Sequence, residues 1–285
     1  MTAKDWLEKA QIEGWAFGAF NIDNLEILKA VIAAGESKKS PVIVEFSDGE
    51  VEYLGLRNIV DLVDNARETA NIPILLNLDH ASSYEACAKA AAACFDMIHF
   101  DGSKLDYDQN VVTAKKVAGL GRSSDLVVEG EMDSIIGSSN VHKENIPAGE
   151  VLAGFTSPQK ALAFVHSTGI DTFAAFFGNV HGTYPNQPRL DLGLLEKIRT
   201  ELPETFLSMH GGSGIPDKQV REAIKVGKIV KINVNTELRQ AFKDNLKSAI
   251  SSSEYAVYKL MPPVIEAIKE VVESKIDLFG SAGKA

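Results

Sequence analysis

The sequence predicts a (β/α)8 TIM barrel with additional helices at its N- and C-terminal ends. Eight short apolar runs alternate with segments of helical periodicity, and this alternation is typical of a parallel sheet whose strands are connected by helices. No turn of the β-hairpin type joins two of these runs, and no linker-like composition divides the chain. Eight such units favour a closed barrel over an open, doubly wound sheet, so we expect residues 1–285 to form a single barrel domain.

The eight predicted strands are short and mostly rich in Val, Ile, Leu and Phe, as expected for strands that helices and a barrel interior cover on both faces. Each run is bounded by residues that favour turns or helix starts. We expect strands at residues 17–21, 41–46, 73–78, 96–100, 125–131, 172–176, 205–209 and 228–233.

Helices are predicted where apolar residues recur three or four positions apart. One precedes the first strand, seven lie between strands, and two complete the chain; the helix at residues 158–167 follows the long polar loop expected after residue 131. The expected helices are residues 3–13, 24–39, 56–70, 83–94, 106–118, 158–167, 191–201, 216–226, 236–250 and 255–275.

Composition limits the classes of partner. The chain is 45% hydrophobic and 24% charged, with a formal net charge of −10 and no run of basic residues. Nucleic acid and anionic membrane surfaces are therefore poor partners. A locally built site can still bind an anionic small molecule, because the global charge does not fix the local one.

The N-terminal sequence has no apolar signal region and no stretch long enough to span a membrane, which predicts a cytoplasmic protein. The only two cysteines, Cys87 and Cys94, lie seven residues apart in an Ala-rich run. We expect them on one helical face as small core residues rather than as a disulfide, consistent with a reducing compartment.

In a barrel of this kind the chemistry lies at the carboxyl ends of the strands. Three of the six histidines, His80, His181 and His210, follow different predicted strands. Each could be a hydrogen-bonded rim residue, but three on one rim suit a catalytic metal site with an open fourth position. His99 lies inside the fourth strand and is expected to pack in the barrel.

A phosphate site is predicted beside the third histidine. The loops after strands seven and eight of such barrels frequently bind phosphate, and here they read Gly211-Gly212-Ser213-Gly214 and Asn233-Val234-Asn235-Thr236-Glu237. Both combine small residues and side-chain hydrogen-bonding groups with a helix N-terminus, which favours an anion. Helix capping by Ser213, Asn235 or Thr236 is an alternative that does not exclude phosphate binding.

These residues resemble the class II, metal-dependent fructose-bisphosphate/tagatose-bisphosphate aldolase family. The resemblance runs in order along essentially the whole chain, and Asp-His together with two His-Gly motifs makes it specific. The matching segments are Phe17–Asn21, Ser40–Ile43, Leu78–His80, Asp101–Ser103, Gly178–Gly182, His210–Ser213 and Phe279–Gly283.

The resemblance implies a role for each matching residue. His80, His181 and His210 would bind one catalytic Zn²⁺, and Asp79 would be the acid/base at the hydroxyl formed or consumed when the carbon–carbon bond breaks or forms. Asp101 and Glu131 match acidic positions that can hold an alternate, second or monovalent cation. Substrate contacts are expected from Asn21 and Ser47, and phosphate contacts from Gly182, Gly211, Gly212, Ser213, Asn233, Asn235 and Thr236.

Two segments depart from the family pattern. The loop after strand five usually carries Gly-Gly and an acidic pair, whereas this chain has Gly137-Ser138-Ser139-Asn140 and then His142 and Glu144. Glu144 or His142 could supply the missing proton-transfer group by a loop movement, or both could be solvated. Pro185 stands where a phosphate-contacting lysine is usual, and the nearest cation is Arg189.

The sequence therefore predicts a class II-type aldolase that cleaves a phosphorylated ketose, such as fructose 1,6-bisphosphate, to dihydroxyacetone phosphate and an aldehyde through a zinc-stabilised enediolate. Two alternatives are a sugar-phosphate-binding homologue with altered substrate or lost catalysis, and a metal-dependent barrel hydrolase. A homodimer or homotetramer is expected by analogy with relatives of this kind.

Overall fold

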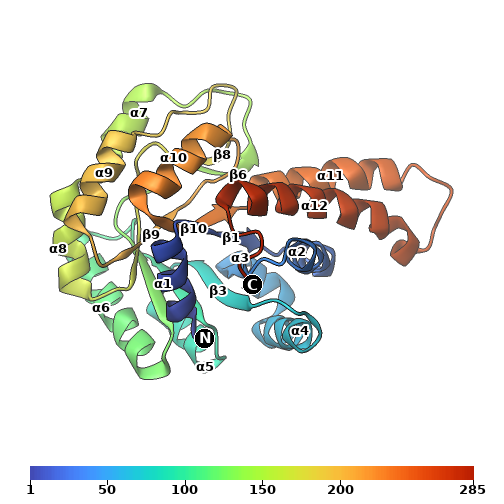
Figure 1. Cartoon of the computed structure of the whole chain (residues 1–285), viewed down its shortest axis with the longest axis horizontal. Coiled ribbons are helices and arrows are strands. Elements are labelled where there is room, and N and C mark those ends of the chain that lie inside the picture. Colours follow the sequence, from blue (N-terminus) through green and yellow to red (C-terminus); the bar gives the residue numbers. More distant parts are fainter.

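Eight parallel strands close into a barrel in the computed structural model, which describes residues 1–285 (Figure 1). Neighbouring strands follow chain order around the barrel, and the last pairs with the first, so the predicted (β/α)8 topology is confirmed. The strands are β1 (Phe17–Asn21), β2 (Val42–Ser47), β3 (Ile74–Ala81), β4 (Met97–Asp101), β5 (Val127–Glu131), β7 (Thr172–Ala174), β9 (Phe206–Met209) and β10 (Ile229–Val234).

Helices surround the barrel, and the expected terminal helices are present at both ends of the chain. Local signals explain several boundaries: Asn24 accepts a hydrogen bond from the Ile27 N–H at the start of α2, and Gly169 and Gly280 end α8 and α12 in the left-handed conformation. The predicted helices correspond to α1 (Ala3–Glu13), α2 (Leu25–Lys38), α4 (Leu56–Thr69), α5 (Tyr84–Ala92), α6 (Tyr107–Ser124), α8 (Pro158–Thr168), α9 (Leu192–Glu201), α10 (Asp217–Gly227), α11 (Thr236–Ala249) and α12 (Val257–Phe279).

Four short elements were not predicted. Helices α3 (Asp48–Leu54) and α7 (Ala148–Ala153) are too brief to show a helical period, and strands β6 (Gly137–Val141) and β8 (His181–Thr183) lack an apolar alternation. β6 and β8 pair in parallel as a separate small sheet. The loop after β5 is therefore partly ordered against the segment that begins at His181.

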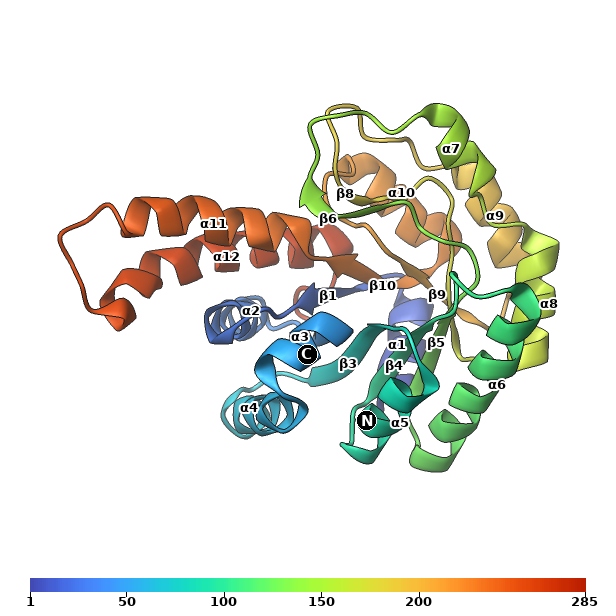
Figure 2. The same cartoon turned by 180° about the vertical axis from the view of Figure 1, so that it is seen from behind.

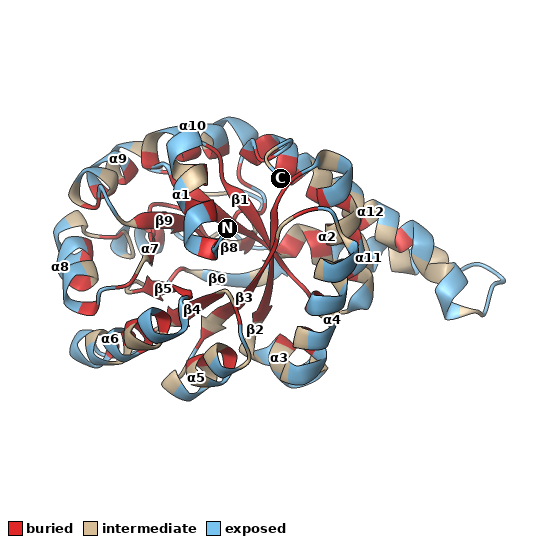
Figure 3. Cartoon of the chain, turned by 60° about the horizontal axis from the view of Figure 1, so that its bottom comes forward, coloured by how far each residue is buried: buried red, intermediate tan, exposed pale blue.

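Apolar side chains fill the space between the strands and the helices, and the strands are buried almost throughout (Figure 3). A smaller cluster, which includes Trp6, Trp15 and Phe17, closes the end of the barrel opposite the strand carboxyl ends. Cys87 belongs to the main core, but the prediction for Cys94 is wrong: α5 ends at Ala92, and Cys94 follows it in a left-handed turn with its side chain exposed.

The barrel interior near the carboxyl ends of the strands is polar rather than apolar. Glu45, Asn77, Glu129, Ser208 and Lys231 are all buried, although their strands read as apolar runs. Because alternate residues of a strand point to the same face, these side chains lie inside the barrel below the residues of the rim.

The last two long helices, α11 and α12, pack along one another and project from the barrel as a hairpin (Figures 1 and 2). Their connecting segment carries the exposed side chains of Ile250 and Tyr255, and the first turn of α12 those of Val257 and Tyr258. None of the helices combines the length and the apolar character that crossing a lipid bilayer requires.

Candidate active site

A polar cavity of about 350 Å³ opens where the barrel strands end. Its walls come from the carboxyl ends of β1, β3, β4, β5 and β10, from the loop after β5 with β6, from β8, and from the turn after β9. Of 20 lining residues only Ile135 is hydrophobic. The lining includes Asn21, Asp79, His80, Asp101, Glu131, His181, Gly182, Gly211, Ser213, Asn233, Asn235 and Thr236, so most of the predicted site residues meet in one place.

Two of the three predicted metal-binding histidines, His80 and His181, line this cavity, and the fully buried His210 lies directly against His80. Nε2 of His80 and Nδ1 of His210 are 2.9 Å apart, and the His181 ring centroid lies 5.1 Å from that of His80 and 6.0 Å from that of His210. The backbone aims the first ring: His80 has a φ of 47°, and the left-handed conformation turns its side chain at the end of β3.

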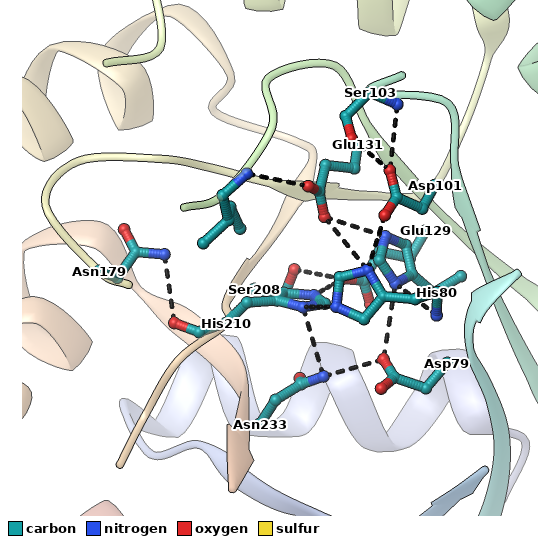
Figure 4. A network of polar contacts seen from close by, with 12 residues as sticks. Asp79, His80, Asp101, Ser103, Glu129, Glu131, Asn179, Ser208, His210 and Asn233 are labelled. Carbon is teal, nitrogen blue, oxygen red and sulfur yellow. Dashed lines mark hydrogen bonds and ion pairs between the residues drawn. The ribbon is translucent and has the colours of Figure 1, made fainter. Parts of the chain in front are cut away.

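Carboxylates decide which ring nitrogens of the two closest histidines remain available. His210 Nε2 lies 2.6 Å from Glu129 Oε1, and His80 Nδ1 lies 2.9 Å from Asp101 Oδ2 (Figure 4). Each carboxylate accepts the ring N–H and directs the opposite nitrogen toward the other histidine. This is the pattern by which carboxylates orient metal-binding imidazoles, so the donor set fits a divalent cation bound through His80 Nε2 and His210 Nδ1.

Burial also keeps two of these imidazoles in the neutral form that a metal requires. Burial, with the nearby charge of His80, lowers the pKa of His181 to about 3. Burial likewise holds the pKa of His210 well below its ordinary value, although Glu129 acts in the opposite direction. Both rings can therefore offer a lone pair at neutral pH. Burial also disfavours the charged form of His80, but Asp79, Asp101 and Glu131 together raise its pKa, so a cation bound there would displace a ring proton.

Asp79 lies beside the histidines and is held from both sides by amides. Asn21 Nδ2 donates to its Oδ2 at 3.1 Å, and Asn233 Nδ2 donates to its Oδ1 at 3.0 Å. Burial opposes the ionised carboxyl, but His80, His99 and Lys231 together keep the pKa of Asp79 well below its usual range. A buried carboxylate that remains ionised and faces a cavity can accept a proton from a bound hydroxyl.

His99 does more than the barrel packing expected of it. It is fully buried, yet its Nδ1 accepts a hydrogen bond from the His80 backbone N–H at 3.1 Å, and its Nε2 lies 3.4 Å from Glu131 Oε2. Its ring therefore links the backbone of one histidine to the carboxylate of Glu131. The ligand atoms of Asp79, His80, His99 and His210 lie close enough together to hold a cation, and those of His80, Asp101 and Glu131 form a second such group. His181 belongs to neither group.

The turn after β9 carries several of the residues predicted to bind phosphate. Gly211 has a φ of 64°, and a Cβ there would meet the Val180 carbonyl oxygen at 2.1 Å, so the close approach requires glycine. Asn179 Nδ2 donates to the His210 carbonyl oxygen at 3.2 Å and fixes this turn against the preceding loop. Asn235 caps no helix through its side chain, and its buried Oδ1 has no protein partner.

Besides the buried His210, four predicted residues do not line the cavity. Gly212 is one of them, and its N–H donates to the Asn233 carbonyl oxygen at 2.9 Å. Ser47 starts α3, where its N–H is bonded to Glu50.

His142 and Glu144 line a neighbouring pocket, and the His142 ring stacks on Tyr184 at 4.2 Å with its Nε2 3.0 Å from the Ser138 carbonyl oxygen. Their catalytic roles stay predictions. Arg189 likewise lines a separate pocket.

Several residues of the site were not anticipated. Ser82, Ser103, Lys104, Ser134, Ser138 and Ser139 line the cavity, and below the rim Lys231 Nζ lies 3.1 Å from Glu129 Oε2. The sequence holds a signal for Glu129 and Lys231. Glu129 stands two residues before Glu131 on one strand, so both side chains point to the same face, and Lys231 is a charged residue within an apolar run.

Known proteins match the chain over its full length. The family model described as fructose-bisphosphate aldolase class-II matches residues 1–284. The chain belongs to the class-II fructose-bisphosphate aldolase family. It is 36% identical over 300 residues to a fructose-bisphosphate aldolase of Streptococcus pneumoniae serotype 4, covering 100% of this chain and 99% of the relative. It is 37% identical over 290 residues to one of Geobacillus stearothermophilus, covering 100% and 98%.

Two solved structures described as aldolases have the same fold as this chain. The crystal structure of the YdjI aldolase from Escherichia coli K12 superposes with a TM-score of 0.86 at 30% identity, covering 99% of this chain and 98% of that one. A putative fructose-1,6-bisphosphate aldolase from Coccidioides immitis gives 0.87 at 27% identity, covering 99% and 97%. The rim histidines and the glycine turn thus lie in a barrel of the class-II aldolase type.

Proposed function

We propose that this class-II family member catalyses the reversible aldol cleavage of a ketose bisphosphate, such as fructose 1,6-bisphosphate, to dihydroxyacetone phosphate and an aldehyde. One observation carries the proposal: the turn that follows β9 places the His210 imidazole, next to His80, directly before the glycine segment that begins at Gly211. We take the imidazole as a ligand of the metal site and the glycine segment as the start of the phosphate site. A substrate that fits this pair of sites carries a chelating carbonyl and a phosphate at a short, fixed separation. Dihydroxyacetone phosphate has both groups.

The cofactor proposed for the three histidines is Zn²⁺, for which imidazole donors are well suited. When bound there, the cation supplies a positive charge that polarises the ketose carbonyl and stabilises an enediolate. Asp101 and Glu131 lie on the other side of His80 and would accommodate an alternate, second or monovalent cation.

The protein groups divide the remaining work. Asp79 Oδ1 or Oδ2 takes the proton from the substrate hydroxyl as the carbon–carbon bond breaks, and it returns that proton in the reverse direction. Asn21 and Asn233 hold its two oxygens in place. Backbone N–H groups of the glycine turn and the N-terminus of α11, with Ser213 and Thr236, receive the phosphate.

The deciding experiment is an activity screen of zinc-loaded protein against a panel of ketose phosphates, together with exchange of the C3 proton of dihydroxyacetone phosphate. Cleavage and exchange are both expected. The variant His210→Ala is the matched control, and we expect it to lose zinc binding. If it binds as much zinc per chain as the wild type, the metal site is removed from the proposal. Absence of both activities in wild type would overturn it.

An aldolase of altered aldehyde specificity is a second candidate. Ser134, Ser138 and Ser139 line the cavity in the loop after β5, and Glu144 lies in the neighbouring pocket. Hydroxyl groups there would hydrogen-bond a polar aldehyde half, but none of them is a carboxylate base. Such an enzyme would exchange the C3 proton and yet fail to cleave fructose 1,6-bisphosphate.

Three organisational predictions accompany the catalytic one. We propose that residues 1–285 work as one barrel domain, that the protein assembles as a homodimer or homotetramer, and that it acts in the cytoplasm. Sedimentation analysis of the full chain would test the assembly.

A further inference from the structure

The catalytic carboxylate proposed above, Asp79, depends on two amide side chains whose orientation matters. A carboxamide presents a donor at one end and an acceptor at the other, and turning it over exchanges the two with little change of shape. Only the orientation with each NH2 group toward Asp79 places donors on both carboxylate oxygens. Neighbouring groups must therefore fix the orientation of the Asn21 and Asn233 carboxamides.

Asn233 is fixed from within the barrel. Lys231 Nζ, which has only donors, lies 2.8 Å from Asn233 Oδ1. The carbonyl end is thereby held at the lysine, and Nδ2 is directed to Asp79 Oδ1 at 3.0 Å.

Asn21 is fixed by a second carboxylate. Its Nδ2 lies 3.1 Å from Asp79 Oδ2 and 3.3 Å from Glu50 Oε2, so its two N–H groups each meet a carboxylate. The opposite orientation would place Asn21 Oδ1 against both carboxylates. Asn21 also lines the cavity, so its orientation determines what it offers a substrate.

Glu50 is itself held at both oxygens. Oε2 also accepts the Ser47 N–H at 2.6 Å, and Oε1 accepts from Arg239 Nη2 at 2.9 Å. Glu50 is 5% exposed, whereas Arg239 reaches in from α11 and also binds Asp23 through two hydrogen bonds. The chain of contacts therefore runs from α11 through α3 to the end of β1 and then to β3.

We propose that Glu50, held by Arg239, is a positioning residue that sets the orientation of Asn21 and through it the position of Asp79. The inference rests on the proposed aldolase function, because it concerns the group that moves the hydroxyl proton. Glu50 does not line the cavity and acts only through Asn21. A merely structural role, capping α3 and anchoring α11, would affect folding but not one chemical step in particular.

The variant Glu50→Gln tests the proposal because one amide cannot replace both acceptors. Arg239 requires an acceptor at one position, and Ser47 N–H with Asn21 requires an acceptor at the other. The guanidinium will capture the glutamine oxygen, since a charged donor makes the stronger hydrogen bond. The glutamine NH2 then faces Asn21, which turns over and presents a carbonyl oxygen to Asp79.

We expect Glu50→Gln to lower kcat for ketose bisphosphate cleavage by about 10–100-fold, the range typical of misplaced supporting groups. Exchange of the C3 proton of dihydroxyacetone phosphate should change by less than about 3-fold, since that step does not involve the hydroxyl served by Asp79. Zinc content should be unchanged. Glu52→Gln, on the same helix with an exposed side chain that makes no hydrogen bond or ion pair, is the matched control.

A double variant separates orientation from folding. In Glu50→Gln/Arg239→Met the guanidinium is absent, so the glutamine oxygen can face Ser47 and Asn21 again. We expect kcat to recover at least 5-fold relative to Glu50→Gln, even if the melting temperature is lower. Equal losses of cleavage and exchange, or no recovery in the double variant, would overturn the proposal. Wild-type protein inactive in both assays would instead overturn the aldolase function, so the two failures are distinguishable.

Discussion

Lys231 is a fully buried cation between two buried carboxylates, and exchanging each carboxylate for its amide should have opposite consequences. Its Nζ lies 3.1 Å from Glu129 Oε2 and 3.4 Å from Glu45 Oε2. The distances alone would assign both as partners. Their protonation states separate them.

Burial, together with the nearby charge of Asp79, raises the pKa of Glu45 to about 8, even though Lys231 and an Asn77 hydrogen bond oppose the shift. Burial also acts on Glu129, but Lys231 and its histidine neighbours hold the pKa of that carboxyl well below its ordinary value. At pH 7 Glu45 is therefore mainly neutral, and Glu129 carries the counter-charge of the lysine.

The magnitude follows from the geometry. Unit charges 3.1 Å apart attract by about 5 kcal/mol at an effective dielectric constant of ~20. Removing one member of such a buried pair costs about 3–5 kcal/mol because the other charge is left uncompensated. Glu129→Gln should lose that much, and at ~2.1 cal/mol/K of unfolding entropy per residue the melting temperature should fall by about 5–8 °C. Glu45→Gln replaces a neutral group and should cost less than about 1 kcal/mol.

The pH dependence of stability tests the protonation state of Glu45 independently. Because Glu45 binds its proton more tightly in the folded state, it stabilises fully below its unfolded pKa, and that contribution is lost as pH rises toward about 8. Glu45→Gln lacks this loss. Relative to wild type, the variant should gain stability between about pH 5 and 8 by at most ~1.4 kcal/mol per pH unit.

Urea unfolding of both variants in the presence of a chelator measures these differences without a contribution from metal affinity. If Glu45→Gln at pH 7 costs as much as Glu129→Gln, Glu45 is ionised and the assignment of the counter-charge fails. A stability difference between Glu45→Gln and wild type that stays constant with pH would refute the same reasoning.

Three further variants test other parts of the site. Gly211→Ala should raise KM for the phosphorylated substrate at least 10-fold and lower the melting temperature, because its Cβ would meet a carbonyl oxygen at 2.1 Å; Gly149→Ala, with no atom within 4 Å of that position, is the control, and equal effects would contradict the phosphate site proposed at this turn. Asp101→Asn should weaken zinc affinity about 10–100-fold in a competition titration with a chelator, and unchanged affinity would exclude its orienting role at His80. His142→Phe should keep cleavage within about 3-fold, since the ring can still stack on Tyr184; a loss above 100-fold would instead support proton transfer by His142.

The rim of the site could be predicted from the sequence because one topological rule brings its members together. His80, His181 and His210 lie far apart in the chain, but each follows a strand, and parallel strands in a barrel end on one side. The rule needs only the order of the elements. It does not need their exact boundaries, several of which differ by one to six residues from those expected.

The layer below the rim could not be predicted as securely, because inward and outward positions of a fully buried strand look alike. The sequence predicts only barrel packing for His99 and assigns no role to Lys231, the one charged residue near the middle of an apolar strand, yet both side chains are buried among polar groups of the site. Assigning them requires the register of each strand. The loop after β5 was harder still, since β6 gains its order from pairing with β8 rather than from an apolar face.

The register explains why the polar layer supports the histidines instead of destabilising the barrel. Glu129 forms an ion pair with Lys231 and hydrogen bonds with the His210 ring and the Ser208 hydroxyl. One carboxylate therefore balances a buried charge, orients an imidazole and gives a buried hydroxyl its acceptor. Separate groups for each task would add buried polar atoms that require partners of their own. Because the same carboxylate serves the fold and the ring orientation, changes to Glu129 should couple stability to metal affinity, whereas changes to Asp101, at the cavity surface, should alter affinity with little effect on stability.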